Sequence, residues 1–177
     1  VQELVPAEVV ASMAERMNLT TSIRAVDAIA LGTSEVYPLE ITSAYATYSN
    51  NGVWCKPIAI NRIVDRFGAT IKEYSPRREE VLSEETAYLV TDLLQSVVDN
   101  GTGGSARWKY KFTHPAGGKT GTTQNWTDAW FVGFSPKIAA GVWFGVDDPK
   151  VSLGVNQSGS RAALPVWAKF MKAAHDS

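Results

Sequence analysis

The chain has 177 residues, of which 45% are hydrophobic and 20% are charged, and its formal net charge is -1. A chain of this length can bury roughly 70% of its unfolded surface, so one globular core suffices, and the balanced charge gives no electrostatic reason to expect a nucleic-acid partner. No apolar run reaches the ~18 residues that cross a bilayer, and the first residues carry neither a basic signal-peptide segment nor an initiator Met, so we expect a piece of a longer protein.

The sequence gives no reason to expect a metal or another cofactor. Cys55 is the only cysteine, and His114 and His175 are the only histidines. One thiol forms no intrachain disulfide, and so few thiols and imidazoles build no ordinary zinc site. We interpret Cys55 as a buried structural thiol in preference to a reactive one.

Two helices are predicted in the first third of the chain. Residues 6–17 begin with a proline that suits a first helical turn, and apolar residues recur on one face: Val9, Val10, Met13 and Met17. Residues 38–49 show helical spacing after Pro38 and stop at Asn50-Asn51-Gly52, a helix C-terminal signal.

The middle of the chain predicts a hairpin and a long helix. Isoleucine and valine residues from 57 to 64 lead to a turn at 65–68, and a second strand returns through Ile71. Ser83 is a plausible N-cap, and the helix after it ends near Asn100-Gly101. Its apolar stripe consists of Ala87, Val90, Leu94, Val97 and Val98.

The last third predicts two strands and a closing helix. The glycine-rich segment 101–105 is interpreted as a connector in preference to a loop over a site. Strands are expected at 128–134 and 138–146, with a turn at 135–137. A helix follows at 162–174, with its apolar face formed by Val166, Trp167, Phe170, Met171 and Ala174. The order of elements predicts an α+β fold with helices packed on an antiparallel sheet.

The segment Lys119-Thr120-Gly121-Thr122-Thr123 carries the candidate chemistry. On a strand, Lys119 and Gly121 point to one side and Thr120 and Thr122 to the other. Gly121 leaves room for a substrate along the strand, while the lysine attracts a carboxylate and the hydroxyls supply directional hydrogen bonds. A phosphate-binding P-loop is rejected because Thr113 occupies a required glycine position and no helix follows. By itself, the short match is equally compatible with a solvated lysine beside a turn.

Longer blocks of sequence support a functional interpretation. Residues 118–123 and 128–134 resemble the transpeptidase domain of class A, bifunctional penicillin-binding proteins. The resemblance extends along nearly the whole chain through further blocks, at 31–40, 44–46, 51–52, 98–103 and 142–145. It implies that residues 1–177 are the C-terminal part of the α+β fold shared by penicillin-binding transpeptidases and serine β-lactamases.

Proteins of this family cross-link peptidoglycan. A serine attacks the penultimate carbonyl of a D-Ala-D-Ala stem peptide, D-alanine leaves, and the acyl group passes to an amine of a neighbouring stem peptide. Penicillins and other β-lactam antibiotics acylate the same serine. The family uses three motifs, Ser-x-x-Lys, Ser-x-Asn and Lys-Thr-Gly, which supply a nucleophile, proton-transfer partners and an edge that binds the electrophile.

The nucleophile motif does not occur in these 177 residues, because no serine is followed by a lysine three places later. Ser49-Asn50-Asn51 matches Ser-x-Asn, but at the end of a predicted helix, so we interpret it as a cap. The resemblance places both other motifs, and two strands of the family's five-stranded sheet, before Val1. We therefore expect the chain alone to be inactive and to behave poorly, with an exposed sheet edge and apolar surface.

The resemblance implies roles for the candidate residues. Lys119 supplies positive charge and assists proton transfer, and the hydroxyls of Thr120 and Thr122 bind the terminal carboxylate of the substrate. The main-chain N–H of Thr122 is one oxyanion-hole donor, and Gly121 and Thr123 belong to the substrate-binding strip. Asp128 and Trp130 are assigned to packing, and loop 101–104 is expected to border the substrate groove.

Two other functions remain open from the sequence. A serine β-lactamase shares the fold and the Lys-Thr-Gly strip but hydrolyses its acyl-enzyme. A non-catalytic module would bind cell-wall peptide or a divisome partner through the same strip. The resemblance further implies a bacterial parent protein with a glycosyltransferase domain and an N-terminal membrane anchor outside this chain, acting on the periplasmic or extracytoplasmic face of the cytoplasmic membrane.

Overall fold

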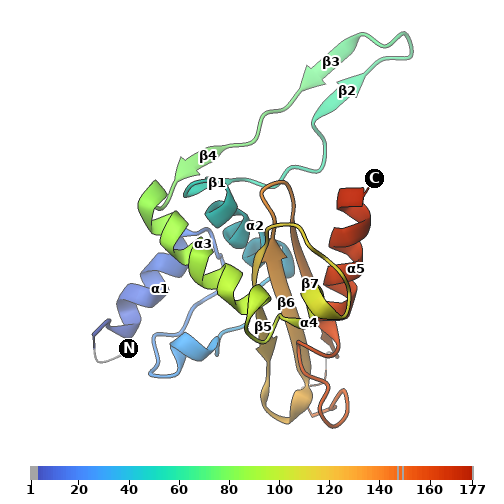
Figure 1. Cartoon of the computed structure of the whole chain (residues 1–177). Helices are drawn as coiled ribbons and strands as arrows, with labels where there is room; N and C mark the ends of the chain where they lie inside the picture. Colours follow the sequence, from blue (N-terminus) through green and yellow to red (C-terminus); the bar gives the residue numbers. More distant parts are fainter. Residues whose placement is uncertain (1–3, 147, 149, 177) are drawn as a thin grey trace.

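A three-stranded antiparallel sheet in the order β5-β6-β7 forms the centre of the fold (Figure 1). The computed structural model describes residues 4–146, 148 and 150–176. The strands are β5 (Gly117–Thr122), β6 (Asp128–Phe134) and β7 (Ala139–Gly145). The two predicted strands are confirmed, and β5 adds a third strand that contains the Lys-Thr-Gly segment.

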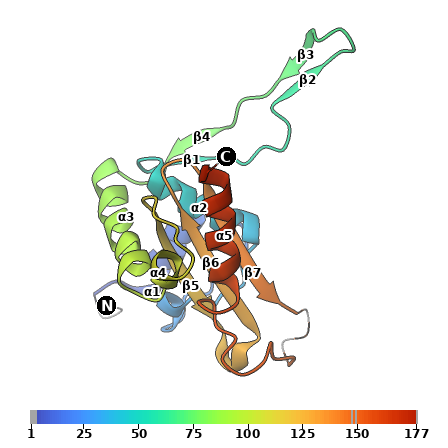
Figure 2. The same cartoon turned by 45° about the vertical axis from the view of Figure 1, so that its right-hand side comes forward.

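Helices cover both faces of this sheet. The centroid of the Phe131 ring lies 4.7 Å from that of Trp167 on α5 (Ala163–Asp176), whereas the Phe134 ring lies 6.3 Å from Tyr48 on α2 (Pro38–Ser49). Phe131 and Phe134 are an odd number of residues apart on β6, so their side chains point to opposite faces. Helix α5 thus packs on one face and α2 on the other, as Figure 2 shows for α5, and the predicted α+β architecture is confirmed.

The main core lies between the sheet, α5 and the segment before β5. Its fully buried side chains include Val98, Phe112, Phe131, Leu164, Trp167 and Met171. The predicted face of α5 is partly wrong, because Val166 and Phe170 are 45% and 52% exposed. The helix meets the sheet through a neighbouring stripe that contains Ala163, Leu164, Trp167, Ala168 and Met171. Both stripes are apolar in sequence, so periodicity alone did not separate them.

The N-terminal part forms a second, smaller core. Helix α1 (Ala7–Arg16) confirms the first predicted helix, with Pro6 at its N-cap. Met17 is buried in a cluster with Ala44, Trp54 and Val81. Val9, which was expected on the apolar face, is 54% exposed, so that part of the prediction is wrong. Helix α2 has the predicted bounds.

A hairpin arm projects from the body of the molecule (Figure 1). Strands β2 (Arg62–Val64) and β3 (Thr70–Glu73) form the predicted hairpin. At its base lies a second antiparallel pair that the sequence did not indicate, β1 (Val53–Cys55) with β4 (Arg78–Glu80). Cys55, which was expected to be buried, is only partly buried because β1 is a short strand in this small pair.

Helix α3 (Glu84–Asp99) runs beside β5, and its first turn confirms the predicted cap. The Ser83 side chain accepts a hydrogen bond from the main-chain N–H of Thr86. Its stripe is anchored by buried Ala87 and Val98. The remaining elements are short: α4 (Ser105–Trp108) and the 3-10 turns Ile29–Leu31 and Gln124–Trp126.

Candidate active site

Strand β5 presents the Lys119–Thr122 segment along an edge of the sheet that no second strand pairs within the part of the chain that the structure describes. Thr123 N–H donates to the Asp128 carbonyl over 3.2 Å. Because hydrogen-bonded and non-hydrogen-bonded pairs alternate in an antiparallel ladder, Gly121 and Lys119 also bond to β6. Thr120 and Thr122 therefore direct their main-chain N–H and C=O groups toward the open edge.

Lys119 is exposed, and its ammonium group lies at this edge. Its Nζ donates to the carbonyl oxygen of Thr120 over 2.8 Å. Since that carbonyl belongs to the unpaired edge, the hydrogen bond holds the ammonium group at this edge. The positive charge is thereby placed beside the main-chain groups of Thr120 and Thr122, where an anion would be attracted.

The Thr120 hydroxyl is joined to the glycine-rich turn after α3. Thr120 Oγ1 and Thr102 Oγ1 lie 2.9 Å apart. The composition of segment 101–105 favoured a connector. Only the resemblance implied that loop 101–104 borders the substrate groove. The signal that identifies the turn is the pair of glycines, Gly101 and Gly103, on either side of Thr102.

The Thr122 hydroxyl lies on the same face of β5 as that of Thr120, and the segment before α5 holds it there. Gly159 N–H donates to Thr122 Oγ1 over 3.0 Å. A Cβ at Gly159 would lie 2.2 Å from the Trp130 carbonyl oxygen and 2.5 Å from that of Gly121, so this segment touches the backbone of the sheet. No sequence pattern indicated Gly159, because it approaches β5 from 37 residues away.

Thr123 closes the turn between β5 and β6. Its Oγ1 accepts from Asp128 N–H over 2.7 Å and lies 2.7 Å from Thr127 Oγ1. Asp128 in turn accepts from Trp143 Nε1 over 2.8 Å. The hydroxyl of Thr123 is therefore occupied within the turn, and Asp128 supports the strands, as expected for its assignment to packing.

The Ser49-Asn50-Asn51 segment lies at the C-terminus of α2. Asn50 is the C-cap residue, and its Nδ2 donates to the Val53 carbonyl over 2.7 Å. Asn51 has a φ of 52°, a left-handed conformation that asparagine tolerates. The capping interpretation is confirmed, and this segment is not brought to the Lys119–Thr122 edge.

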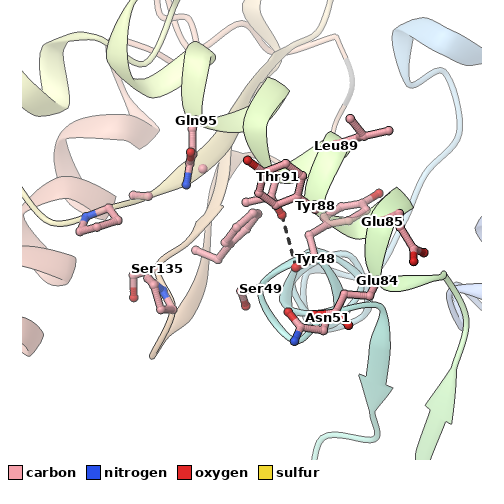
Figure 3. A pocket seen from close by; sticks show the side chains of 15 residues that line it. Tyr48, Ser49, Asn51, Glu84, Glu85, Tyr88, Leu89, Thr91, Gln95 and Ser135 are labelled. Atoms are coloured by element: carbon pink, nitrogen blue, oxygen red, sulfur yellow. Dashed lines mark hydrogen bonds between the residues drawn. The ribbon is translucent and has the colours of Figure 1, made fainter.

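A separate hollow lies away from this edge. It has a volume of about 550 Å³ and opens between α2, α3 and the turn after β6, with Tyr48, Tyr88 and Ser135 in its wall (Figure 3). It touches β5 only at Gly117. We assign the candidate site to the edge of β5 instead, because the hollow contains none of the residues at 119–123.

Two tyrosines near this hollow resist ionisation. Burial raises the pKa of Tyr45 to about 12, and the neighbouring Tyr48, whose ring centroid is 5.7 Å away, adds to the shift. Burial also raises the pKa of Tyr48. Both phenols consequently remain neutral at physiological pH and serve packing.

None of the helices over residues 4–146, 148 and 150–176 has the length and apolar character needed to span a membrane. In the same residues, no group of three or more histidine, cysteine or carboxylate side chains is placed to hold a metal ion.

Curated relatives match most of the chain. It is 49% identical over 144 residues to penicillin-binding protein 1A of Aquifex aeolicus, a match that covers 81% of this chain and 19% of the relative. It is 34% identical over 164 residues to penicillin-binding protein 2D of Bacillus subtilis, covering 90% of this chain and 23% of the relative. The chain thus spans about a fifth of the length of these relatives.

Solved structures agree with the fold. Penicillin-binding protein 1A from Haemophilus influenzae superposes with a TM-score of 0.91 at 25% identity, over 98% of this chain and 31% of that protein. PonA1 from Mycobacterium tuberculosis, solved in complex with penicillin V, gives a TM-score of 0.77 at 23% identity, over 95% of this chain and 50% of that one. The family model described as the penicillin binding protein transpeptidase domain matches residues 13–172. The chain therefore belongs to the penicillin-binding protein transpeptidase family.

Proposed function

We propose that this chain is the C-terminal part of a peptidoglycan D,D-transpeptidase domain and forms the electrophile-binding wall of its active site. The observation that carries the proposal is the open edge of β5, where Lys119 and the outward main-chain groups of Thr120 and Thr122 lie together. The two relatives described above, both penicillin-binding proteins, support the same reaction class.

In the proposed reaction, a serine hydroxyl attacks the penultimate carbonyl carbon of a stem peptide that ends in D-Ala-D-Ala. The carbonyl oxygen becomes an oxyanion, and Thr122 N–H donates to it. Collapse of this intermediate breaks the peptide bond, and D-alanine leaves after its nitrogen receives the proton that the serine hydroxyl gave up. An amine of a second stem peptide then attacks the acyl-enzyme, and one of its protons returns to the serine oxygen as the serine is released. β-Lactam antibiotics acylate the same serine.

The residues of β5 have separate roles in this proposal. Lys119 supplies positive charge and assists proton transfer, while the hydroxyls of Thr120 and Thr122 bind the terminal carboxylate. Gly121 carries no side chain, so the substrate lies along the strand as an added strand would. Thr123 ends the strip, and its hydroxyl stabilises the turn that holds the wall in place.

The nucleophilic serine is proposed to come from sequence outside these 177 residues, since no Ser-x-x-Lys motif occurs in them. The chain alone is accordingly expected to be inert toward penicillin. The parent protein is proposed to act outside the cytoplasmic membrane, with a membrane anchor and a glycosyltransferase domain that also lie outside this chain.

Penicillin labelling of the full-length protein that contains this chain tests the proposal. A long-lived covalent adduct on one serine is expected, together with no adduct on the 177-residue chain. Rapid turnover of the adduct would instead identify a serine β-lactamase. Complete inertness of the full-length protein would favour a non-catalytic binding module.

A further inference from the structure

A hydroxyl outside the Lys-Thr-Gly strip lies in contact with it. Thr102 Oγ1 is 2.9 Å from Thr120 Oγ1, in a geometry that allows either oxygen to be the donor. Thr102 is exposed and comes from the turn after α3, 18 residues before its partner. The pair therefore joins two elements at the open edge of β5.

The turn that carries Thr102 is folded tightly onto the end of α3. The carbonyl oxygen of Val97 accepts from Gly101 N–H over 3.2 Å and from Gly103 N–H over 2.9 Å. A Cβ at Gly101 would lie 2.9 Å from this oxygen, and one at Gly103 would lie 3.0 Å from it. Glycine on each side of Thr102 is thus required by the close approach, and the turn has little freedom to shift.

Arg107 fixes the turn relative to the segment that enters β5. Its guanidinium donates to Asp99 over 2.8 Å at the end of α3. The same guanidinium donates through Nη1 to the carbonyls of Phe112 and His114, over 2.9 and 2.6 Å. One planar guanidinium thus binds both the end of α3 and the segment before β5. These hydrogen bonds hold the turn that carries Thr102 at a constant separation from the strand that carries Thr120.

The direction of the hydrogen bond between Thr102 and Thr120 determines where the Thr120 proton is available. A threonine hydroxyl has one proton to donate and two lone pairs to accept with. When Thr102 donates to Thr120, the Thr120 proton is left to donate to an anion at the open edge. The Thr122 proton is likewise left to donate to an anion, since Thr122 Oγ1 accepts from Gly159 N–H.

We propose that Thr102 is a positioning residue that orients the hydroxyl proton of Thr120 toward the carboxylate of the bound stem peptide or β-lactam. This inference rests on the proposed function. The carboxylate selects the arrangement in which Thr102 donates, so the two hydroxyls form a short chain in which each bond strengthens the other.

The test is the acylation kinetics of the full-length protein with benzylpenicillin and with its methyl ester, which lacks the carboxylate charge. Thr102→Val keeps the shape of the side chain but removes the hydroxyl, and Thr102→Ser keeps the hydroxyl. With benzylpenicillin, Thr102→Val should lower the second-order rate constant about tenfold, through weaker binding. Thr102→Ser should stay within about twofold of the parent, and the ester should react equally with all three proteins.

Equal reactivity of Thr102→Val and the parent toward benzylpenicillin would overturn the inference. An equal loss toward the ester would also overturn it, because a purely structural role does not depend on the carboxylate. In a Thr120→Val background, Thr102→Val should have no further effect, and Thr102→Ala provides the same comparison if the valine variant does not fold. Failure of the parent protein to be labelled at all contradicts the proposed function and is distinguishable from these outcomes.

Discussion

The main-chain N–H of Gly159 donates to the hydroxyl of Thr122 over 3.0 Å, joining the segment before α5 to the strand that carries the candidate site. Gly159 is buried, and its α-carbon faces the carbonyl oxygens of Trp130 and Gly121. The position of α5 and the direction of the Thr122 hydroxyl are therefore linked through one glycine.

Gly159→Ala should damage both stability and the site. The added methyl would lie 2.2 Å from the Trp130 carbonyl oxygen, so the segment must move away from β5 and the bond to Thr122 must lengthen. We expect a stability loss of about 2–3 kcal/mol and slower acylation of the full-length protein by labelled penicillin.

Gly32→Ala provides the matched control for this prediction. Its φ of 77° makes alanine cost about 1–2 kcal/mol, while its Cβ meets no atom within 4 Å. The control should lose stability and keep the parental acylation rate. If Gly159→Ala also kept the parental rate, the hydrogen bond from Gly159 to Thr122 would not contribute to acylation.

Lys119→Ala should slow acylation of the full-length protein by about 10²-fold, the size of one lost electrostatic contact in an acyl-transfer site. The reason is that Lys119 places the positive charge beside the outward groups of Thr120 and Thr122. Lys169→Ala, which removes an exposed lysine on α5, should leave the rate unchanged. A parental rate for Lys119→Ala would exclude its proposed role.

The two apolar stripes of α5 should respond differently to substitution. Trp167 is fully buried and its Nε1 donates to the Ala140 carbonyl over 3.1 Å, so Trp167→Ala should cost about 3–5 kcal/mol and lower the melting temperature of the transpeptidase domain. Phe170 is 52% exposed, and Phe170→Ala should cost less than about 0.5 kcal/mol. Thermal unfolding of the full-length protein measures both, and a large effect at Phe170 would show that sequence outside this chain covers it.

Tyr45 should make the fold sensitive to alkali. Its pKa is raised to about 12 in the folded chain, so the folded state retains a proton that the unfolded state loses near pH 10. This contribution is fully present below pH 10 and is lost as the pH rises to 12, by up to about 2–3 kcal/mol. Tyr45→Phe should remove this part of the pH dependence in melting experiments.

Tyr88→Phe is the control for the alkaline experiment, because Tyr88 is 70% exposed. Its melting temperature should follow that of the parent between pH 10 and 12. If Tyr45→Phe followed the parent as well, ionisation of Tyr45 would not be coupled to unfolding.

Local signals predicted several elements because they act within a few residues. Pro38 and Asn50 set the ends of α2, and Ser83 begins α3 through its own side chain. The β1-β4 pair was missed because three-residue strands carry too little periodicity. The burial of α5 was partly wrong because periodicity identifies apolar stripes but does not reveal which stripe another element covers.

The family was predictable from the sequence because blocks that resemble it run along nearly the whole chain. The residue types of the strip were readable in the same way: a cation, hydroxyls and a glycine at 119–123. The atoms that surround the strip became evident from the fold alone. Thr102 and Gly159 reach β5 from separate segments, and Thr120 and Thr122 face an open edge because of the register of β5 with β6. These relationships depend on packing between distant segments, and packing has no local sequence signal.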